Sequence, residues 1–150
     1  MLGLPHRYFA TSTATPKAPV RLNSHGLGEM ISDPPKEFGG SGRLWSPETL
    51  LMAAVADCFV LTFRAVADAS HLSWAHMECT AQGTLDRADG LIRFTDIHLR
   101  VALTLANVTD MERARQLVEK AEKGCLVSNS LKCPRTLEVE LDAVEEMQTA

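Results

Sequence analysis

A long apolar segment, residues 46–69, constrains the fold more than any other part of the sequence. It opens with Ser46, a good N-cap residue, and with Pro47, whose missing N–H would have no intrahelical partner at the first helical position. At about 100° per residue, the charged residues after the first turn fall on one narrow stripe, and apolar or small residues cover nearly all the rest. The sequence therefore predicts one long helix that is buried on most sides.

A membrane span is the competing interpretation of this helix. Asp57 and Arg64 would each cost about 2.5–3.5 kcal/mol near the centre of a bilayer, and no belt of aromatic residues flanks the segment. The sequence therefore favours a core helix that does not enter a membrane. The chain does not open with a basic region followed by an apolar core, so we expect the protein in the cytoplasm.

The composition indicates a single domain over residues 1–150, because 45% hydrophobic and 23% charged residues in a chain of this length suffice for one core but not two. A formal net charge of −4 with scattered basic residues gives no footprint for nucleic acid or an anionic membrane. The four cysteines contain no Cys-x-x-Cys pair, and a chain with a normal core needs no disulfide staples. Any disulfide is therefore expected to be catalytic or regulatory.

The residues before the long helix predict a small β-meander and a loop. Residues 7–13 are rich in β-forming residues, and residues 20–23 and 27–31 flank a Ser-His-Gly turn as the two arms of a hairpin. Residues 32–42 contain two prolines and three glycines, which predict a loop that leads into the helix.

Two strands joined by a turn are predicted after the long helix. Residues 72–85 alternate in polarity, which places Ala75 and Cys79 on an inward face. A turn at 86–90 leads to a second alternating strand. The inward residues of that strand are Ile97, Leu99, Val101, Leu103 and Leu105. An antiparallel pair follows, with Cys79 in the core.

An amphipathic helix and a last strand complete the predicted order. Thr109 and Glu112 have the spacing of a capping box, and apolar residues repeat at helical spacing over 110–123, before Gly124 ends the helix. Residues 136–143 then alternate as a strand. This order indicates an α+β domain rather than repeated βαβ units.

Two of the four cysteines have surroundings that suit redox chemistry. Cys58 lies on the long helix, where a cysteine is commonly an inert hydrophobe. Its neighbours at helical spacing are small, namely Ala54, Thr62 and Ala65. Cys125 lies at a junction between helix and loop, where backbone N–H groups of the following turn would stabilise a thiolate. Two such cysteines permit a nucleophile and a resolving partner, but their spacing does not place them together.

These segments resemble the OsmC/Ohr family of thiol peroxidases, named after osmotically induced protein C and organic hydroperoxide resistance protein. The likeness rests on a Ser-Pro-Glu opening at residues 46–48, an alanine- and leucine-rich run, and Cys58 ten residues after the glutamate. It includes a Phe-Gly-Gly loop at residues 38–40 and a second cysteine that opens the segment 125–129. The resemblance extends over nearly the whole chain, from about residue 7 to residue 144.

The resemblance implies an OsmC-like α+β fold, with antiparallel sheets packed around a long central helix and a second amphipathic helix, in an intertwined homodimer. The scarcity of polar surface on the long helix independently predicts a homodimer. Two positions depart from the family pattern. Leu126 stands where the family usually has proline, and the activating arginine of the hydroperoxide-resistance branch is matched most nearly by Lys17, or alternatively by Arg21. A lysine lacks the planar fork of an arginine.

The resemblance also implies the activity, which is reduction of organic hydroperoxides or hydrogen peroxide. The Cys58 thiolate would attack a peroxide oxygen and become a sulfenic acid, and Cys125 would condense with it to a disulfide that an external thiol or dithiol reduces. Cys58 lies in the middle of its helix, where the helix N-terminus cannot lower its pKa, so the sequence predicts an activating cation from elsewhere in the fold.

The family pattern places Glu48 in the active site as well. Ten residues of helix separate Glu48 from Cys58 by about 15 Å along the axis, beyond the reach of a glutamate side chain. The sequence therefore predicts that Glu48 acts across the dimer interface, where it holds Lys17 or Arg21 beside the partner's Cys58.

Two other functions compete with a peroxidase. One is a non-catalytic module of the same fold, either a thiol redox sensor or a binder of a small ligand. The other is a zinc site that uses Cys125 and Cys133, and Cys133 also competes for a disulfide with Cys125. The five histidines have no metal-ligand spacing, so no metal and no cofactor are expected.

Overall fold

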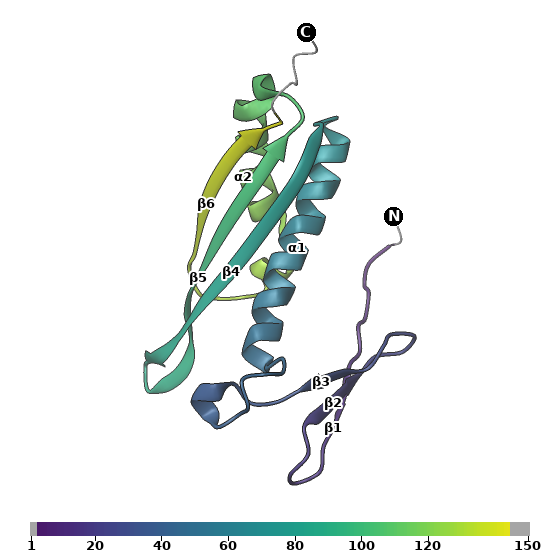
Figure 1. Ribbon diagram of the computed structural model, residues 1–150, viewed down its shortest axis with the longest axis vertical. Coiled ribbons are helices and arrows are strands. Elements are labelled where there is room, and N and C mark those ends of the chain that lie inside the picture. Colours follow the sequence, from purple (N-terminus) through teal and green to yellow (C-terminus); the bar gives the residue numbers. More distant parts are fainter. Residues whose placement is uncertain (1–2, 145–150) are drawn as a thin grey trace. The chain divides into compact units, whose positions relative to one another are not determined.

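The structure is a computed structural model that describes residues 3–144 (Figure 1). The chain divides into two units, one that runs to Leu51 and one that begins at Met52. The long helix α1 (Pro47–Ala69) starts in the first unit and continues into the second. Each unit has its own three-stranded sheet.

The first unit contains an antiparallel sheet in the order β1-β2-β3, which confirms the predicted meander. Its strands are β1 (Thr11–Thr13), β2 (Val20–Asn23) and β3 (Met30–Ser32). The segment predicted only as a loop also contains a short 3-10 helix, η1 (Lys36–Phe38).

Two glycines make the loop after η1 possible. Gly39 ends the 3-10 helix with φ of 86°, in the left-handed region that favours glycine. A Cβ on Gly40 would lie 1.5 Å from the carbonyl oxygen of Pro34, so only glycine fits there. The loop therefore depends on this Gly-Gly pair for its backbone path.

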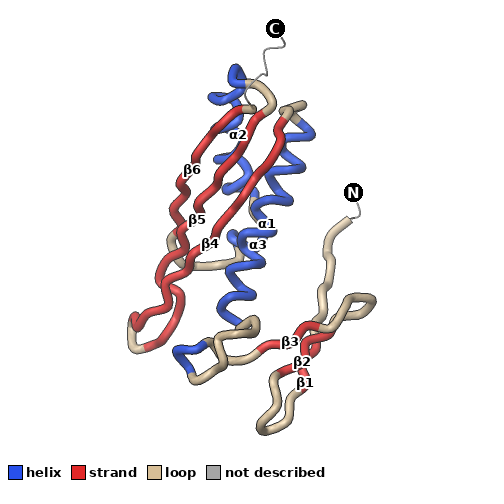
Figure 2. The backbone as a smooth tube through the Cα atoms, in the orientation of Figure 1, coloured by secondary structure: helices blue, strands red, loops and turns tan. Residues whose placement is uncertain are grey.

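The second unit contains the sheet β4-β5-β6, and Figure 2 shows α1 and α2 on one face of it. Its elements after α1 are β4 (Trp74–Ala88), β5 (Leu91–Leu105), η2 (Val108–Asp110), α2 (Met111–Gly124), α3 (Leu126–Asn129) and β6 (Arg135–Ala143). The core lies between the helices and β5, whose predicted inward residues are all buried. The α+β class is thus as predicted.

One strand direction differs from the prediction. We expected antiparallel sheets, and β4 does pair antiparallel with β5, but β6 pairs parallel with β5. The chain between β5 and β6, residues 106–134, contains α2 and α3. A helical crossover of this kind returns the chain to the same end of the sheet, which is what a parallel pair needs.

The β4–β5 hairpin is longer than predicted. Its turn is confined to Asp89 and Gly90, which have φ of 52° and 78°, so residues 86–88 continue β4. A register shift between Trp74 and His76 also turns Ala75 outward, and Ala75 is exposed rather than part of the core face. Alternation in polarity did not reveal this irregularity, because a bulge reverses which face a side chain occupies.

The start of α2 also differs from the prediction. Thr109 lies within η2, and Asp110 precedes the helix without any side-chain cap hydrogen bond, so the predicted capping box is wrong. The 3-10 turn provides the helix entry instead. The apolar stripe was predicted correctly, since Ala114, Leu117, Val118 and Ala121 are buried.

The start of α1 is capped as predicted. The N–H of Thr49 donates to Ser46 Oγ at 3.2 Å, and the N–H of Ser46 donates to Thr49 Oγ1 at 2.8 Å. This reciprocal pair satisfies donors that have no intrahelical partner.

The burial of α1 is narrower than the sequence predicted. Only one stripe of the helix is fully buried, consisting of Val55, Phe59, Phe63 and Ala67. By length and composition α1 is long and apolar enough to cross a membrane, but its buried stripe packs in the core with β5 and α2. A second, apolar stripe around Cys58 remains exposed, with Leu61 49% exposed.

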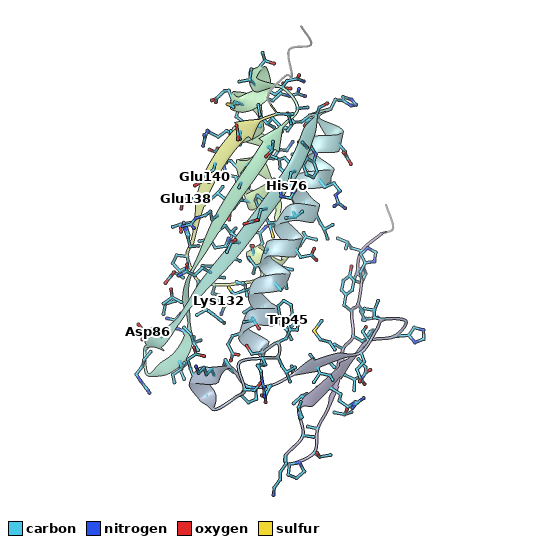
Figure 3. The ribbon with its side chains drawn as sticks, in the orientation of Figure 1. Trp45, His76, Asp86, Lys132, Glu138 and Glu140 are labelled. Atoms are coloured by element: carbon cyan, nitrogen blue, oxygen red, sulfur yellow. The ribbon has the colours of Figure 1, made fainter. Side chains whose placement is uncertain are left out.

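On the polar face of the sheet, exposed hydrogen bonds connect side chains of β5 to side chains of β6. His98 Nε2 lies 3.1 Å from Glu138 Oε2, and Arg100 Nε donates to the same oxygen at 3.5 Å. Figure 3 shows Glu138 and Glu140 along strand β6. The hydrogen bond with His98, followed by the charge of Arg100, lowers the pKa of Glu138.

Candidate functional site

The candidate site centres on Cys58, which lies half-buried on α1. Its neighbours on the same stripe of the helix, Ala54, Leu61 and Ala65, are exposed. The hydroxyl of Thr62 donates to the backbone carbonyl of Cys58 at 2.7 Å, one turn along. The Cys58 thiol therefore lies at the border between the core and an apolar surface.

A backbone N–H from a distant segment reaches the Cys58 sulfur. Val127, in α3, donates its N–H to Cys58 Sγ at 3.5 Å. The sequence predicted that the N–H groups after Cys125 would stabilise Cys125 itself. The Ser128 backbone does stabilise the Cys125 thiolate in this way, and the structure also directs the Val127 N–H to Cys58, because α3 packs beside α1.

These contacts favour the thiolate form of Cys58. Burial raises the pKa of Cys58, but the Val127 N–H and a hydrogen bond from the Cys125 thiol act in the opposite direction and outweigh it. The pKa of Cys58 is therefore lowered from its ordinary value. Backbone N–H groups thus stabilise the Cys58 thiolate, for which the sequence had predicted only an activating cation.

Cys125 has the opposite character. It is fully buried, and burial raises its pKa, with hydrogen bonds from Ser128 offsetting part of this and the nearby Cys58 adding to it. The Ser128 hydroxyl donates to Cys125 Sγ at 3.2 Å. Two neighbouring thiols whose pKa values are pushed apart suit different roles, with Cys58 as the thiolate and Cys125 as the protonated thiol beside it.

The structure thus brings Cys58 and Cys125 together, which their spacing in the sequence did not establish. The other two cysteines pack against the core. Burial, with a smaller contribution from the charge of Cys125, raises the pKa of Cys79 to about 11. Among residues 3–144, no three His, Cys, Asp or Glu side chains gather in an arrangement that would hold a metal ion.

The other predicted site residues lie in the first unit. Glu48 is in the first turn of α1, and its Oε2 is buried without a hydrogen-bond partner in the described part of the chain. Glu48 lines a pocket of about 260 Å³. Its other lining residues include Ser32, Asp33, Pro34 and Phe38.

The two candidate cations, Lys17 and Arg21, do not bind Glu48 in the part of the chain that the structure describes. Lys17 is exposed in the connection between β1 and β2. The guanidinium of Arg21 forms an ion pair with Glu29, at 2.6 Å between Nη2 and Oε1. Within residues 3–144, no ion pair or hydrogen bond links Glu48 to Lys17 or to Arg21.

The sequence did not point to Arg135, which makes three hydrogen bonds near the cysteines. Arg135, at the start of β6, donates to the backbone carbonyl of Ser128 and to the side chains of Glu122 and Asn129. In the sequence Arg135 is one of three lysines or arginines that directly follow a proline, with Lys17 and Lys36. No local pattern marks it, because its partners come from two helices.

Comparison with known proteins identifies the class of protein. Residues 40–140 match the family described as OsmC-like protein, so the chain belongs to the OsmC-like family. This confirms the resemblance found in the sequence. The fold agrees, since an OsmC-like protein of unknown function from Vibrio cholerae superimposes with a TM-score of 0.82 over 91% of this chain and 100% of that chain, at 17% identity.

The chain is also similar in sequence to two bacterial proteins. The uncharacterized protein YmaD from Bacillus subtilis is 28% identical over 112 residues, which is 73% of this chain and 73% of that protein. Peroxiredoxin OsmC from Escherichia coli is 29% identical over 96 residues, which is 64% of this chain and 66% of that protein.

Proposed function

We propose that this protein is a cysteine-based peroxidase that reduces organic hydroperoxides or hydrogen peroxide. The observation that carries the proposal is that Cys58 meets the turn that follows Cys125, where the Val127 N–H donates to the Cys58 sulfur at 3.5 Å. The pKa of Cys58 is lowered there and the pKa of the neighbouring Cys125 is raised. The name peroxiredoxin, given to the relative from E. coli, supports the same chemistry.

The proposed reaction has three steps. The Cys58 thiolate attacks one peroxide oxygen, and the O–O bond breaks. The leaving alkoxide, or hydroxide in the case of hydrogen peroxide, takes up a proton, which gives a Cys58 sulfenic acid and an alcohol or water. The Cys125 thiol then attacks the sulfenic sulfur, so that a disulfide forms and water leaves. An external thiol or dithiol finally donates two electrons and two protons, which restores both cysteines.

We further propose that the active form is a homodimer that shares its sites. The support is the exposed apolar stripe beside Cys58 on α1, which a second copy would cover. Glu48 has a buried carboxylate oxygen without a partner in the described residues, which would suit a cation held at the interface. In this proposal Glu48 orients Lys17, or Arg21, beside the partner's Cys58.

The direct test is turnover. Purified protein is mixed with cumene hydroperoxide and a dithiol reductant, and loss of hydroperoxide is followed over time. A peroxidase consumes many equivalents of hydroperoxide per chain. Consumption that stops at one equivalent per chain, despite excess reductant, would instead support a redox sensor.

A matched variant makes the test specific. Cys133→Ser keeps the Cys58 and Cys125 pair and is expected to retain turnover, because Cys133 has no part in the reaction. Metal analysis of protein purified without chelator tests the zinc alternative separately. Stoichiometric zinc that is lost in Cys133→Ser would overturn the peroxidase assignment for Cys125.

A further inference from the structure

The segment that carries Cys125 is held at both ends by one arginine. Arg135 Nε donates to Glu122 Oε1 at 2.8 Å, and Glu122 lies in the last turn of α2. Arg135 Nη1 donates to the Ser128 carbonyl at 2.7 Å, and Nη2 donates to Asn129 Oδ1 at 3.2 Å. Cys125 lies between these anchor points, so the guanidinium spans the turn that contains it.

The ion pair in this arrangement is more shielded than the others in the described chain. The side chains of Arg135 and Glu122 are each 19% exposed, whereas those of Arg100 and Glu138 are 59% and 47% exposed. A shielded pair with several hydrogen bonds holds its geometry better than an exposed one. The planar fork of arginine directs its donors from three separate nitrogens, whereas the three N–H donors of a lysine leave a single nitrogen and could not reach the same three acceptors.

The anchored turn is short, and it draws its support from its surroundings, where Cys125 and Ser128 are fully buried and Val127 packs against the core. The helix α3 has only four residues, and a helix of one turn is not stable without support from its surroundings. Asn129 Nδ2 also donates to the Lys123 carbonyl at 2.9 Å, so the Asn129 side chain bridges α2 and Arg135. These bonds together set where the residues between Lys123 and Asn129 lie.

Both groups that act on the cysteines belong to this turn. The Val127 N–H donates to the Cys58 sulfur, and the Ser128 hydroxyl donates to the Cys125 sulfur. The Ser128 carbonyl that Arg135 binds is in the next residue after Val127. A shift of the turn by an ångström would therefore lengthen the contact to Cys58 and move the Cys125 thiol as well.

We propose that Arg135, with Glu122, is a positioning residue that holds the Val127 N–H and the Cys125 thiol at Cys58. The proposal rests on the proposed peroxidase function for its effect on catalysis. It assigns no contact with substrate to Arg135. Its consequence is that the Cys58 sulfenic acid meets Cys125 and loses water to form the disulfide before a second peroxide oxidises it further.

The experiment compares Arg135→Gln with the wild type and with a matched control, Arg100→Gln, which breaks an exposed ion pair on the same sheet. The first readout is the pH at which Cys58 is alkylated at half its maximal rate, measured by mass spectrometry of the peptide. The second is the ratio of disulfide to sulfinic acid at Cys58 after a fixed dose of hydroperoxide without reductant.

In Arg135→Gln we expect the alkylation midpoint to rise by about one pH unit, the size of a lost hydrogen bond to a charged group. The sulfinic fraction should rise several-fold, and Arg135→Lys should recover only part of each change. Arg100→Gln should match the wild type in both readouts. A folded Arg135→Gln with an unchanged midpoint and an unchanged sulfinic fraction would overturn the proposal.

A second variant covers the case in which Arg135→Gln does not fold. Asn129→Ala removes one bond to the guanidinium and the Asn129 bond to the Lys123 carbonyl, and it should shift both readouts in the same direction as Arg135→Gln. A folded Asn129→Ala that matches the wild type in both readouts would overturn the proposal as well. The alkylation midpoint needs no peroxide turnover, so an inactive wild type would overturn the peroxidase function while the positioning role is still decided.

Discussion

The two units of the chain contribute to the proposed site in very different ways. In the second unit, one chain by itself brings two groups to the Cys58 sulfur, since the Val127 N–H donates to it and Cys125 lies next to it. In the first unit, the Glu48 carboxylate has an oxygen that is buried without a partner in the described residues, and the Arg21 guanidinium is already paired with Glu29.

This difference separates the part of the proposed mechanism that one chain provides from the part that requires a second chain. Backbone donors on the turn after Cys125 favour the Cys58 thiolate within one chain, and the contacts described for Cys58 and Cys125 all lie in residues 52–144. Within the described residues, the Glu48 carboxylate contacts neither Lys17 nor Arg21, so our proposal assigns their role to the dimer. Variants in the thiol pair should therefore act within each chain, and variants in the first unit should act between chains.

The largest effect is expected at the thiol pair. Cys58→Ser should abolish hydroperoxide turnover, because a hydroxyl cannot form the sulfenic acid. Cys125→Ser should consume one equivalent and then accumulate sulfinic acid at Cys58, since no resolving thiol remains. Turnover assays with intact-mass measurement distinguish the two results, and sustained turnover in Cys58→Ser would remove Cys58 from the mechanism.

The next effect tests whether the first unit acts between chains. Inactive Cys58→Ser is mixed with inactive Glu48→Gln under conditions that exchange subunits. In a shared site, one site of each heterodimer carries both defects and the other carries neither, so activity should return towards half of the wild type per heterodimer. Absence of recovery, with exchange proven by native mass spectrometry, would show that Glu48 does not act across the interface.

A third prediction concerns the stability of the first unit. Gly40→Ala would place a Cβ 1.5 Å from the Pro34 carbonyl oxygen, and relief of this clash requires the backbone to move. We expect a loss of about 2–3 kcal/mol in the free energy of unfolding. Gly28→Ala is the control, because a Cβ there meets nothing within 4 Å. Equal unfolding midpoints in urea for both variants would refute the close approach.

The smallest effect compares two thiols of the second unit as a function of pH. The lowered pKa of Cys58 means that its thiolate, and its alkylation rate, should be half-maximal below the pH of an ordinary cysteine. The pKa of Cys79, at about 11, leaves about one molecule in ten thousand as thiolate at pH 7. Peptide mass spectrometry of alkylated protein measures both, and a midpoint for Cys58 above that for Cys79 would contradict the account.

The sequence predicts those parts of the fold that depend on local pattern. Apolar periodicity located α1 and the stripe of α2, and alternation identified the inward residues of β5. The wrong predictions concern features that local pattern does not encode. The bulge that exposes Ala75 and the parallel pairing of β6 both depend on how distant segments meet.

The candidate site divides in the same way. The sequence singled out Cys58 and Cys125, but their meeting and the role of the Val127 N–H follow from the packing of α3 beside α1. The sequence did not single out Arg135 for the same reason, since its three hydrogen bonds connect residues of two helices to the start of a strand. A contact between elements that are far apart in the sequence leaves no periodic signal.

The most direct measurement of the central claim is the identity of the disulfide formed by mild oxidation. Reduced protein is treated with one equivalent of hydroperoxide, free thiols are blocked, and the linked peptides are mapped by mass spectrometry. We predict an intrachain bond between Cys58 and Cys125, with Cys79 and Cys133 blocked as free thiols. A bond between Cys125 and Cys133, with Cys58 left free, would contradict the two-cysteine mechanism.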